Sequence, residues 1–260
     1  LEQLLLGYDN LKNEVMLYTG AWQSQIFDYF IEMNGSIKES PRITSQDFNS
    51  FLNYDSTNPH SIEEYAKRLI GMSFSDVCNA DQNNEVIVVD EEYESSHEDK
   101  KRKGGLGDLI EERYFHYKCN SDSRPDFPDA GVELKVTPYK INKNGSLSAK
   151  ERLSITMIDY FKVVNEPFES SHLWSKSRLI LLIYYLYKAD IEDRLNYRIN
   201  YAQLFTPPAA DLVIIKQDYE KIVSKIKSGK AHELSEGDTL YLGAAIRIKS
   251  TTAGTSSACA

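Results

Sequence analysis

The chain has 260 residues, of which 41% are hydrophobic, and this length and composition allow it to bury a core. Its longest apolar run, at residues 179–187, is too short to cross a bilayer, and no basic segment followed by an apolar one opens the sequence. We therefore expect one large soluble domain with additions, and no membrane or secreted protein.

The net charge of -9 is divided unevenly along the chain. Residues 1–100 hold 19 acidic against 6 basic residues, a balance of -13, whereas residues 101–260 hold 20 against 24, a balance of +4. Residues 101–260 are therefore basic enough to bind a polyanion. The three cysteines lack paired metal-ligand spacing, which favours reduced thiols and a cytoplasmic location.

The first 57 residues are expected to form a mostly helical extension, because "YDNLKNEVMLY" and "WQSQIFDYFIEM" have helix-like apolar spacing. The main domain is expected over residues 58–260. It begins with a helix from Ser61, which has capping-box spacing to Glu64. An acidic linker is expected near residues 88–100, since six of the residues at 90–99 are acidic.

Helical and strand-like patterns alternate after the linker. A helix at 104–117 is followed by strand-like segments at 131–138, 151–160 and 178–187, then by a helix at 217–229 and a strand at 238–249. This order predicts an α/β (α+β) fold in which helices flank a mixed sheet.

The segment "RPDFPDAGVELKVTP", residues 124–138, contains the main candidate site. The two-residue period of a strand places Glu133 and Lys135 on one face, about 6–7 Å apart, opposite Val132 and Leu134. Asp126 lies seven residues before Glu133, so that two carboxylates are able to converge on a hard cation such as Mg²⁺. By spacing alone, the charged face of an ordinary strand is the favoured interpretation, and a metal-dependent site is the alternative.

The sequence around this segment resembles that of the MutH family of DNA endonucleases. This family includes a mismatch-repair nickase and GATC-cutting type II restriction enzymes. The resemblance is carried by "GLGDLIE" at 105–111 and by "SDSRPDFPDAGVELKVTP", and it extends from about residue 61 to the end of the chain. It implies a restriction-endonuclease-like fold of the PD-(D/E)xK type. The sequence is more similar to the restriction enzymes of this family than to the nickase.

Carried over residue by residue, the resemblance makes Asp126 and Glu133 the principal metal ligands and Lys135 the residue that orients or activates water. Glu111 becomes the further acidic member of the site, and its neighbour Glu112 is expected to be a solvated surface charge. Lys176 matches a lysine placed near the catalytic centre. Mg²⁺ is the implied cofactor.

The resemblance also implies contacts with double-stranded DNA. Arg247 and Lys249 follow the last strand and are candidates for reading guanine edges, with phosphate contact as the plainer alternative. His172 is a candidate for phosphate contact or a structural histidine. The acidic linker is expected to be a solvated connection, or else to occupy the DNA groove when DNA is absent.

The function expected from the sequence is therefore that of a Mg²⁺-dependent type II restriction endonuclease, or of its catalytic domain, acting at GATC-like sites. The alternatives are a MutH-like repair nickase and a catalytically silent DNA-binding module. Since position 1 is Leu, we also expect a fragment, with a homodimer or a further C-terminal domain completing the protein.

Overall fold

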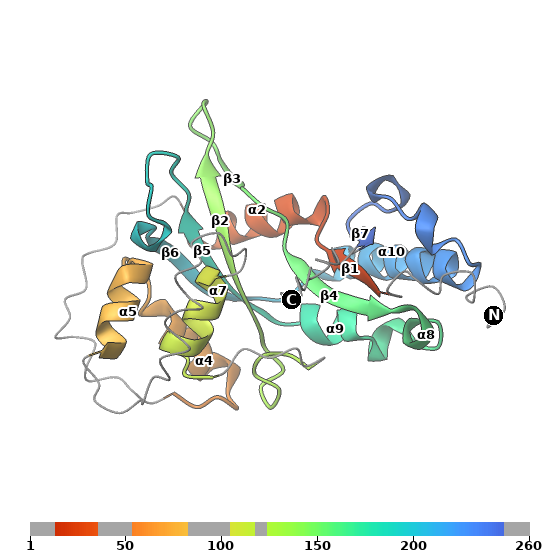
Figure 1. Ribbon diagram of the computed structural model, residues 1–260, viewed down its shortest axis with the longest axis horizontal. Coiled ribbons are helices and arrows are strands. Elements are labelled where there is room, and N and C mark those ends of the chain that lie inside the picture. The colour runs from red at the N-terminus through yellow and green to blue at the C-terminus, as the bar shows by residue number, and fades with distance from the viewer. Residues whose placement is uncertain (1–13, 36–53, 83–104, 118–123, 247–260) are drawn as a thin grey trace, which may run out of the picture.

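A four-stranded mixed sheet forms the centre of the protein in the computed structural model, which describes residues 14–35, 54–82, 105–117 and 124–246 (Figure 1). Its strand order is β3-β2-β5-β6. β2 and β5 are parallel, while β3 and β6 run antiparallel to their neighbours. The strands are β2 (Glu133–Ile141), β3 (Leu147–Ala149), β5 (Ile180–Leu186) and β6 (Ile199–Phe205). The prediction of a mixed sheet flanked by helices is confirmed.

A second, three-stranded sheet contains a strand where we expected a helix. Its order is β4 (Ser154–Asp159), β1 (Glu14–Tyr18) and β7 (Gly243–Ile246), and both pairings are antiparallel. The expectation of helix across "YDNLKNEVMLY" was wrong for its last five residues. A short apolar run fits either structure, and backbone pairing on both sides of β1 decides for the strand.

Helices gather at the two ends of the molecule. In Figure 1, α4, α5 and α7 lie near one end, and α8, α9 and α10 lie toward the other. No helix in the described ranges is both long and apolar enough to span a membrane. The helices are α2 (Trp22–Asn34), α4 (Pro59–Lys67), α5 (Phe74–Gln82), α7 (Gly105–Leu109), α8 (Tyr160–Val163), α9 (His172–Ser177) and α10 (Ala209–Lys227). Single turns are η2 (Ile110–Tyr114), η3 (Phe168–Ser170), η4 (Arg194–Asn196), η5 (Ala231–Glu233) and η6 (Glu236–Asp238).

Helix α4 begins earlier than its capping pattern suggested. Asn58 is the N-cap, and its side chain accepts hydrogen bonds from the backbone N–H groups of His60 and Ser61. Pro59 occupies the first helical position, where a missing N–H costs nothing. The predicted start at Ser61 was therefore wrong, and the Ser61 hydroxyl instead accepts from the backbone N–H of Asp55.

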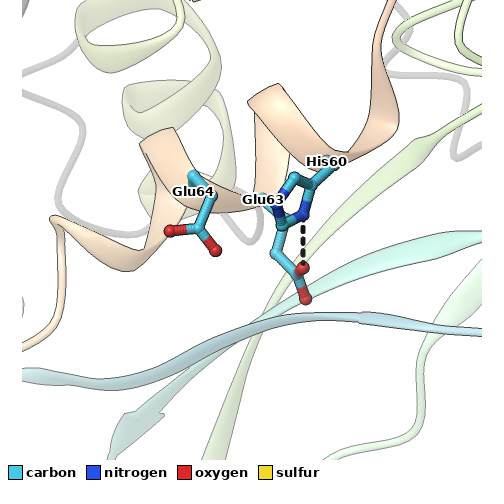
Figure 2. A group of neighbouring side chains, drawn as sticks. All are labelled: His60, Glu63 and Glu64. Carbon is cyan, nitrogen blue, oxygen red and sulfur yellow. Dashed lines mark ion pairs between the residues drawn. The ribbon is translucent and has the colours of Figure 1, made fainter.

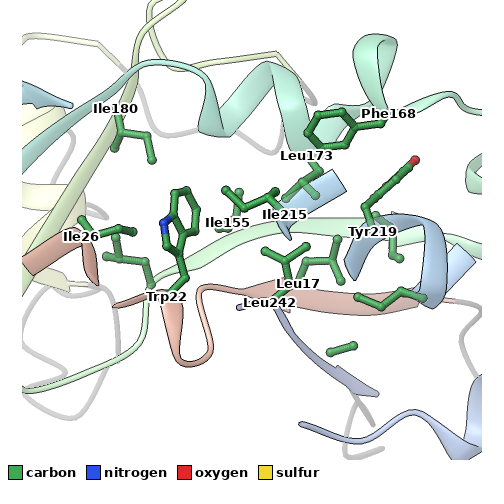
Figure 3. Packing of buried hydrophobic residues seen from close by; sticks show 14 of the residues in the cluster. Leu17, Trp22, Ile26, Ile155, Phe168, Leu173, Ile180, Ile215, Tyr219 and Leu242 are labelled. Atoms are coloured by element: carbon green, nitrogen blue, oxygen red, sulfur yellow. The ribbon is translucent and has the colours of Figure 1, made fainter. Parts of the chain in front are cut away.

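Strand β5 separates two hydrophobic clusters, since its side chains alternate between them. Ile180, Leu182 and Tyr184 belong to the cluster that includes residues of α2 and α10, part of which is drawn in Figure 3. Leu181 and Ile183 belong to the cluster formed with α4, α5 and α7. Burial on both faces explains why the strand is almost continuously apolar.

The N-terminal segment contributes directly to the first cluster. Leu17, Trp22, Ile26, Phe27 and Phe30 are all buried in it. Residues 17–30 of the expected N-terminal extension are therefore packed into this core. The acidic linker expected near 88–100 lies outside the described residues, and the domain boundary at 57/58 stays a prediction.

Candidate active site

A tight turn brings two of the predicted carboxylates together. Phe127 and Val132 form an isolated antiparallel bridge, with N–H···O distances of 2.9 and 3.2 Å, and Gly131 closes the turn with a φ of 66°. Asp126 and Glu133 flank this bridge on its two strands, so they lie next to each other. The Asp126 carboxylate also accepts a hydrogen bond of 2.8 Å from the backbone N–H of Leu134.

The alternation expected along β2 is confirmed. Val132 and Leu134 are buried in the cluster with α4, α5 and α7. Glu133 and Lys135 share the other face, and the Lys135 Nζ donates to Glu133 Oε1 at 2.6 Å. The Glu133 carboxylate is only 1% exposed.

A second lysine reaches the same carboxylate from α9. The Lys176 Nζ lies 3.1 Å from Glu133 Oε2 and 3.3 Å from Oε1. Helix α9 leads into β5, which pairs in parallel with β2. At the start of this pairing, the Glu133 N–H donates to the Leu179 carbonyl. A buried carboxylate is thus held between two ammonium groups at the start of β2.

The charges of the site perturb one another. Burial, followed by the negative charge of Glu133, raises the pKa of Asp126, although Lys135 and Lys176 oppose this rise. Burial alone would lower the pKa of Lys135, but Glu133, Asp126 and Glu111 together outweigh burial and raise it. Glu111 is therefore close enough to Lys135 to act on its charge.

Glu111 lies in η2, a π-helical turn that continues α7. Its wider hydrogen bonding is seen in the bond from the Phe115 N–H to the Ile110 carbonyl, 3.0 Å. The 100° spacing of an α-helix does not apply there. Glu112 is half-buried with one carboxylate oxygen shielded from solvent, whereas we expected a solvated surface charge.

Residues 115–218 match the family model described as "DNA mismatch repair enzyme MutH". This part of the chain is therefore similar to the MutH family. The matched residues include Asp126, Glu133, Lys135 and Lys176, and Glu111 lies just before them. This similarity and the mixed sheet agree with the expected restriction-endonuclease-like fold.

Two kinds of curated relative are similar to this chain. The type II restriction enzyme Sau3AI of Staphylococcus aureus is 49% identical over 146 residues, 55% of this chain and 29% of the relative. The DNA mismatch repair protein MutH of Shewanella woodyi is 30% identical over 145 residues, 55% of this chain and 60% of that protein. MutH of Shewanella amazonensis is 32% identical over 149 residues, 55% of this chain and 62% of that protein. The matches thus span less than two thirds of each relative.

The donor chemistry of the site fits a hard divalent cation, on which restriction and MutH-type enzymes generally depend. Such a cation takes carboxylate oxygens and keeps several waters, so two neighbouring carboxylates suffice to hold it. Asp126 and Glu133 lie close enough for the charge of Glu133 to raise the pKa of Asp126, after the larger effect of burial. Asp126 and Glu133, with Glu111 nearby, are the residues able to hold the ion.

Of the other predicted residues, His172 lies within the described ranges and contacts Glu166. The His172 backbone N–H donates to Glu166 Oε1 at 2.9 Å, and its Nε2 lies 3.9 Å from the same oxygen, so this histidine ties the start of α9 to the preceding turn. Its role in DNA contact stays a prediction. Arg247 and Lys249 lie outside the described residues.

Another group of possible ligands lies on α4, away from β2. His60, Glu63 and Glu64 form the one set of three His, Cys, Asp or Glu side chains whose ligand atoms lie within 4.8 Å of one another in the described ranges (Figure 2). Glu63 accepts a hydrogen bond from the Leu204 N–H at 2.9 Å, and Lys67 pairs with both glutamates. These contacts attach α4 to the edge strand β6 and account for the group without a metal.

Proposed function

We propose that this chain is the catalytic domain of a type II restriction endonuclease that hydrolyses phosphodiester bonds of double-stranded DNA. The observation that supports the proposal is Glu133, held between Lys135 and Lys176 beside Asp126, in a domain 49% identical to a restriction enzyme. An ordinary charged strand face does not gather two carboxylates and two ammonium groups, as the start of β2 does here.

Each residue of the site has a proposed role. Asp126 and Glu133, with Glu111, hold Mg²⁺, which supplies charge neutralisation at the phosphate and a more acidic water. Lys135 orients the attacking water and adds positive charge near the growing negative charge on the phosphate. Lys176 keeps the Glu133 carboxylate in place and adds a second positive charge. The products expected from the resemblance are a 5′-phosphate and a 3′-hydroxyl.

The target and the setting of the enzyme follow from the resemblance alone. GATC-like sites are the proposed target, with Arg247 and Lys249 as the base-reading residues and His172 as a phosphate contact. A cytoplasmic location is proposed with them. A homodimer, or a further domain beyond this chain, is the proposed complete form.

The test is incubation of the 260-residue chain with a duplex bearing one GATC site, with Mg²⁺ or with EDTA, in each methylation state. We expect cutting at the site with Mg²⁺ and none with EDTA. The matched variant Asp126→Asn keeps an oxygen for the Leu134 N–H but loses the charge, and its cutting rate should fall by roughly 10²-fold or more while DNA binding is retained. Equal cutting by this variant would remove the catalytic assignment.

A MutH-like nickase is the second candidate, because MutH proteins are 30–32% identical over a similar length. Supercoiled plasmid separates the two. A restriction enzyme cuts both strands without any partner protein, whereas nicking that requires mismatch-repair factors would favour the nickase. A catalytically silent binding module would shift the plasmid in a gel and leave it intact under both conditions.

A further inference from the structure

Arg178 lies directly against the turn that carries the proposed site. It follows α9, two residues after Lys176, and its side chain is exposed. Its guanidinium covers Gly131, the residue that closes the turn between Asp126 and Glu133. A Cβ built on Gly131 would lie 2.3 Å from Nη2 of Arg178 and 3.2 Å from Cζ.

The backbone of Gly131 favours glycine at this position. Its φ of 66° is one that residues with side chains rarely adopt, and the absence of a Cβ leaves the space that the guanidinium fills. The Arg178 guanidinium therefore lies over the turn that joins Asp126 and Glu133.

The Arg178 guanidinium makes no ion pair within the described ranges, unlike the two lysines of the site. Lys135 and Lys176 both bind Glu133. For the Arg178 guanidinium, by contrast, residues 14–35, 54–82, 105–117 and 124–246 provide neither an ion pair nor a hydrogen-bond acceptor, and the side chain faces solvent. An arginine presents a planar fork of N–H donors that matches a phosphate.

We propose that Arg178 binds a backbone phosphate of the DNA next to the bond that is cut. This inference rests on the proposed function, and it adds a residue that positions the substrate. Phosphate contacts fix the register of a protein on the duplex and carry no base specificity by themselves. Arg178 would therefore hold GATC-containing and unrelated duplexes equally, and bring the backbone to the carboxylates.

Arg198 offers a matched control. It is also an exposed arginine, but its Nη1 donates to the Gly71 carbonyl at 2.8 Å. It lies just before β6, whose other end, at Phe205, pairs with Ile180 beside the site. Its removal takes away the same charge from the opposite end of the sheet.

The experiment measures binding of the full chain to a fluorescent GATC duplex and to an unrelated duplex in EDTA, across a salt series. Arg178→Ala should weaken binding to both duplexes by roughly 5-fold to 20-fold and make the slope of log affinity against log salt shallower by about 1. Arg178→Lys should restore the slope and part of the affinity. Arg198→Ala should match the unaltered chain, and all variants should unfold at similar temperatures.

Neutral methylphosphonates, placed singly along each strand, locate the phosphate. At one position beside the cut, the substitution should weaken binding of the unaltered chain and of Arg198→Ala, and have no further effect on Arg178→Ala. If Arg178→Ala behaves like Arg198→Ala at every position and salt concentration, the inference is overturned while the proposed function stands. If the unaltered chain neither binds nor cuts the duplex, the proposed function fails and the inference fails with it.

Discussion

Glu133 is the residue on which the site depends, because it is a buried carboxylate with two cationic partners. Taking a carboxylate out of water is costly, and the cost is offset here by hydrogen bonds from Lys135 and Lys176. Removing either lysine leaves the charge less compensated. Each lysine is therefore expected to affect stability as well as activity.

Lys135→Met should lower the cutting rate by roughly 10²–10³-fold, because it removes the ammonium nearest to the proposed water and phosphate. Lys140→Met is the control, since Lys140 lies on the same strand and is exposed. Single-turnover cutting rates at saturating enzyme, with the melting temperature of each variant, check the prediction. Equal losses in the two variants would contradict the role of Lys135.

Glu111→Gln should reduce cutting far more than Glu112→Gln. The charge of Glu111 acts on Lys135, and no such effect of Glu112 on this lysine is found in the described residues. Both substitutions keep the shape of the side chain. Cutting rates across a Mg²⁺ titration provide the measurement, and the Glu111 variant should need more metal. The reverse order would move the third carboxylate to Glu112.

Part of the site could be predicted from its sequence, for reasons that differ between residues. Strand alternation alone placed Glu133 and Lys135 on one face. Lys176 came only from the resemblance, because 43 residues separate it from Glu133 and no local pattern reports a contact at that range. Glu111 also needed the resemblance, since a π-helical turn breaks the periodicity on which a helical face is drawn.

At the scale of elements, two tyrosines hold the turn that carries Glu111. The Tyr114 hydroxyl donates to the Tyr65 carbonyl at 2.7 Å, and the Tyr65 hydroxyl donates to the Tyr114 carbonyl at 3.2 Å. Their rings also stack, with centroids 4.5 Å apart. These reciprocal contacts fasten η2 to α4, so the position of Glu111 depends on both elements.

Tyr114→Phe should therefore destabilise the protein by about 0.5–1.5 kcal/mol, because it removes a buried hydrogen bond to the Tyr65 carbonyl, which then keeps the Arg68 N–H at 3.2 Å. Tyr201→Phe is the control, as the Tyr201 hydroxyl is buried without a hydrogen-bond partner in the described ranges, and its loss should be neutral or stabilising. Urea unfolding measures both changes. A neutral Tyr114→Phe would show that the hydrogen bond from the Tyr114 hydroxyl does not help to hold η2.

The elements differ in how well their sequences predict them. β5 was predictable because seven consecutive apolar residues buried on both faces fit a central strand. β1 was not, because its five residues fit a helical pattern and become a strand only when β4 and β7, from distant parts of the chain, pair with them. Sequence periodicity cannot report such partners.

At the scale of the whole molecule, the N-terminal segment is bound to both sheets and to α10. The Trp22 Nε1 donates to Asp211 Oδ2 at 3.1 Å, and the Gln23 side chain donates to the Tyr184 hydroxyl at 3.3 Å. Thr19 Oγ1 accepts from the Leu153 N–H at 2.9 Å. Residues 14–34 are thus part of the body that supports the site.

A chain beginning at residue 58 should consequently lose cooperative unfolding and all cutting, because it lacks the central strand of one sheet and the core residues of α2. Point substitutions on α2 test the same idea more gently. Phe30→Ala, at a fully buried position, should cost about 3–5 kcal/mol. Met33→Ala, at a side chain that is 55% exposed, should change stability by about 0.5 kcal/mol or less.

Calorimetry and urea unfolding of the three variants distinguish a structural segment from an appendage. An appendage would leave the truncated chain with a single sharp transition and with metal-dependent cutting, and Phe30→Ala would then be as mild as Met33→Ala. The hydrogen bond from Trp22 to Asp211 predicts the opposite, since α10 loses a buried partner whenever the N-terminal segment is removed.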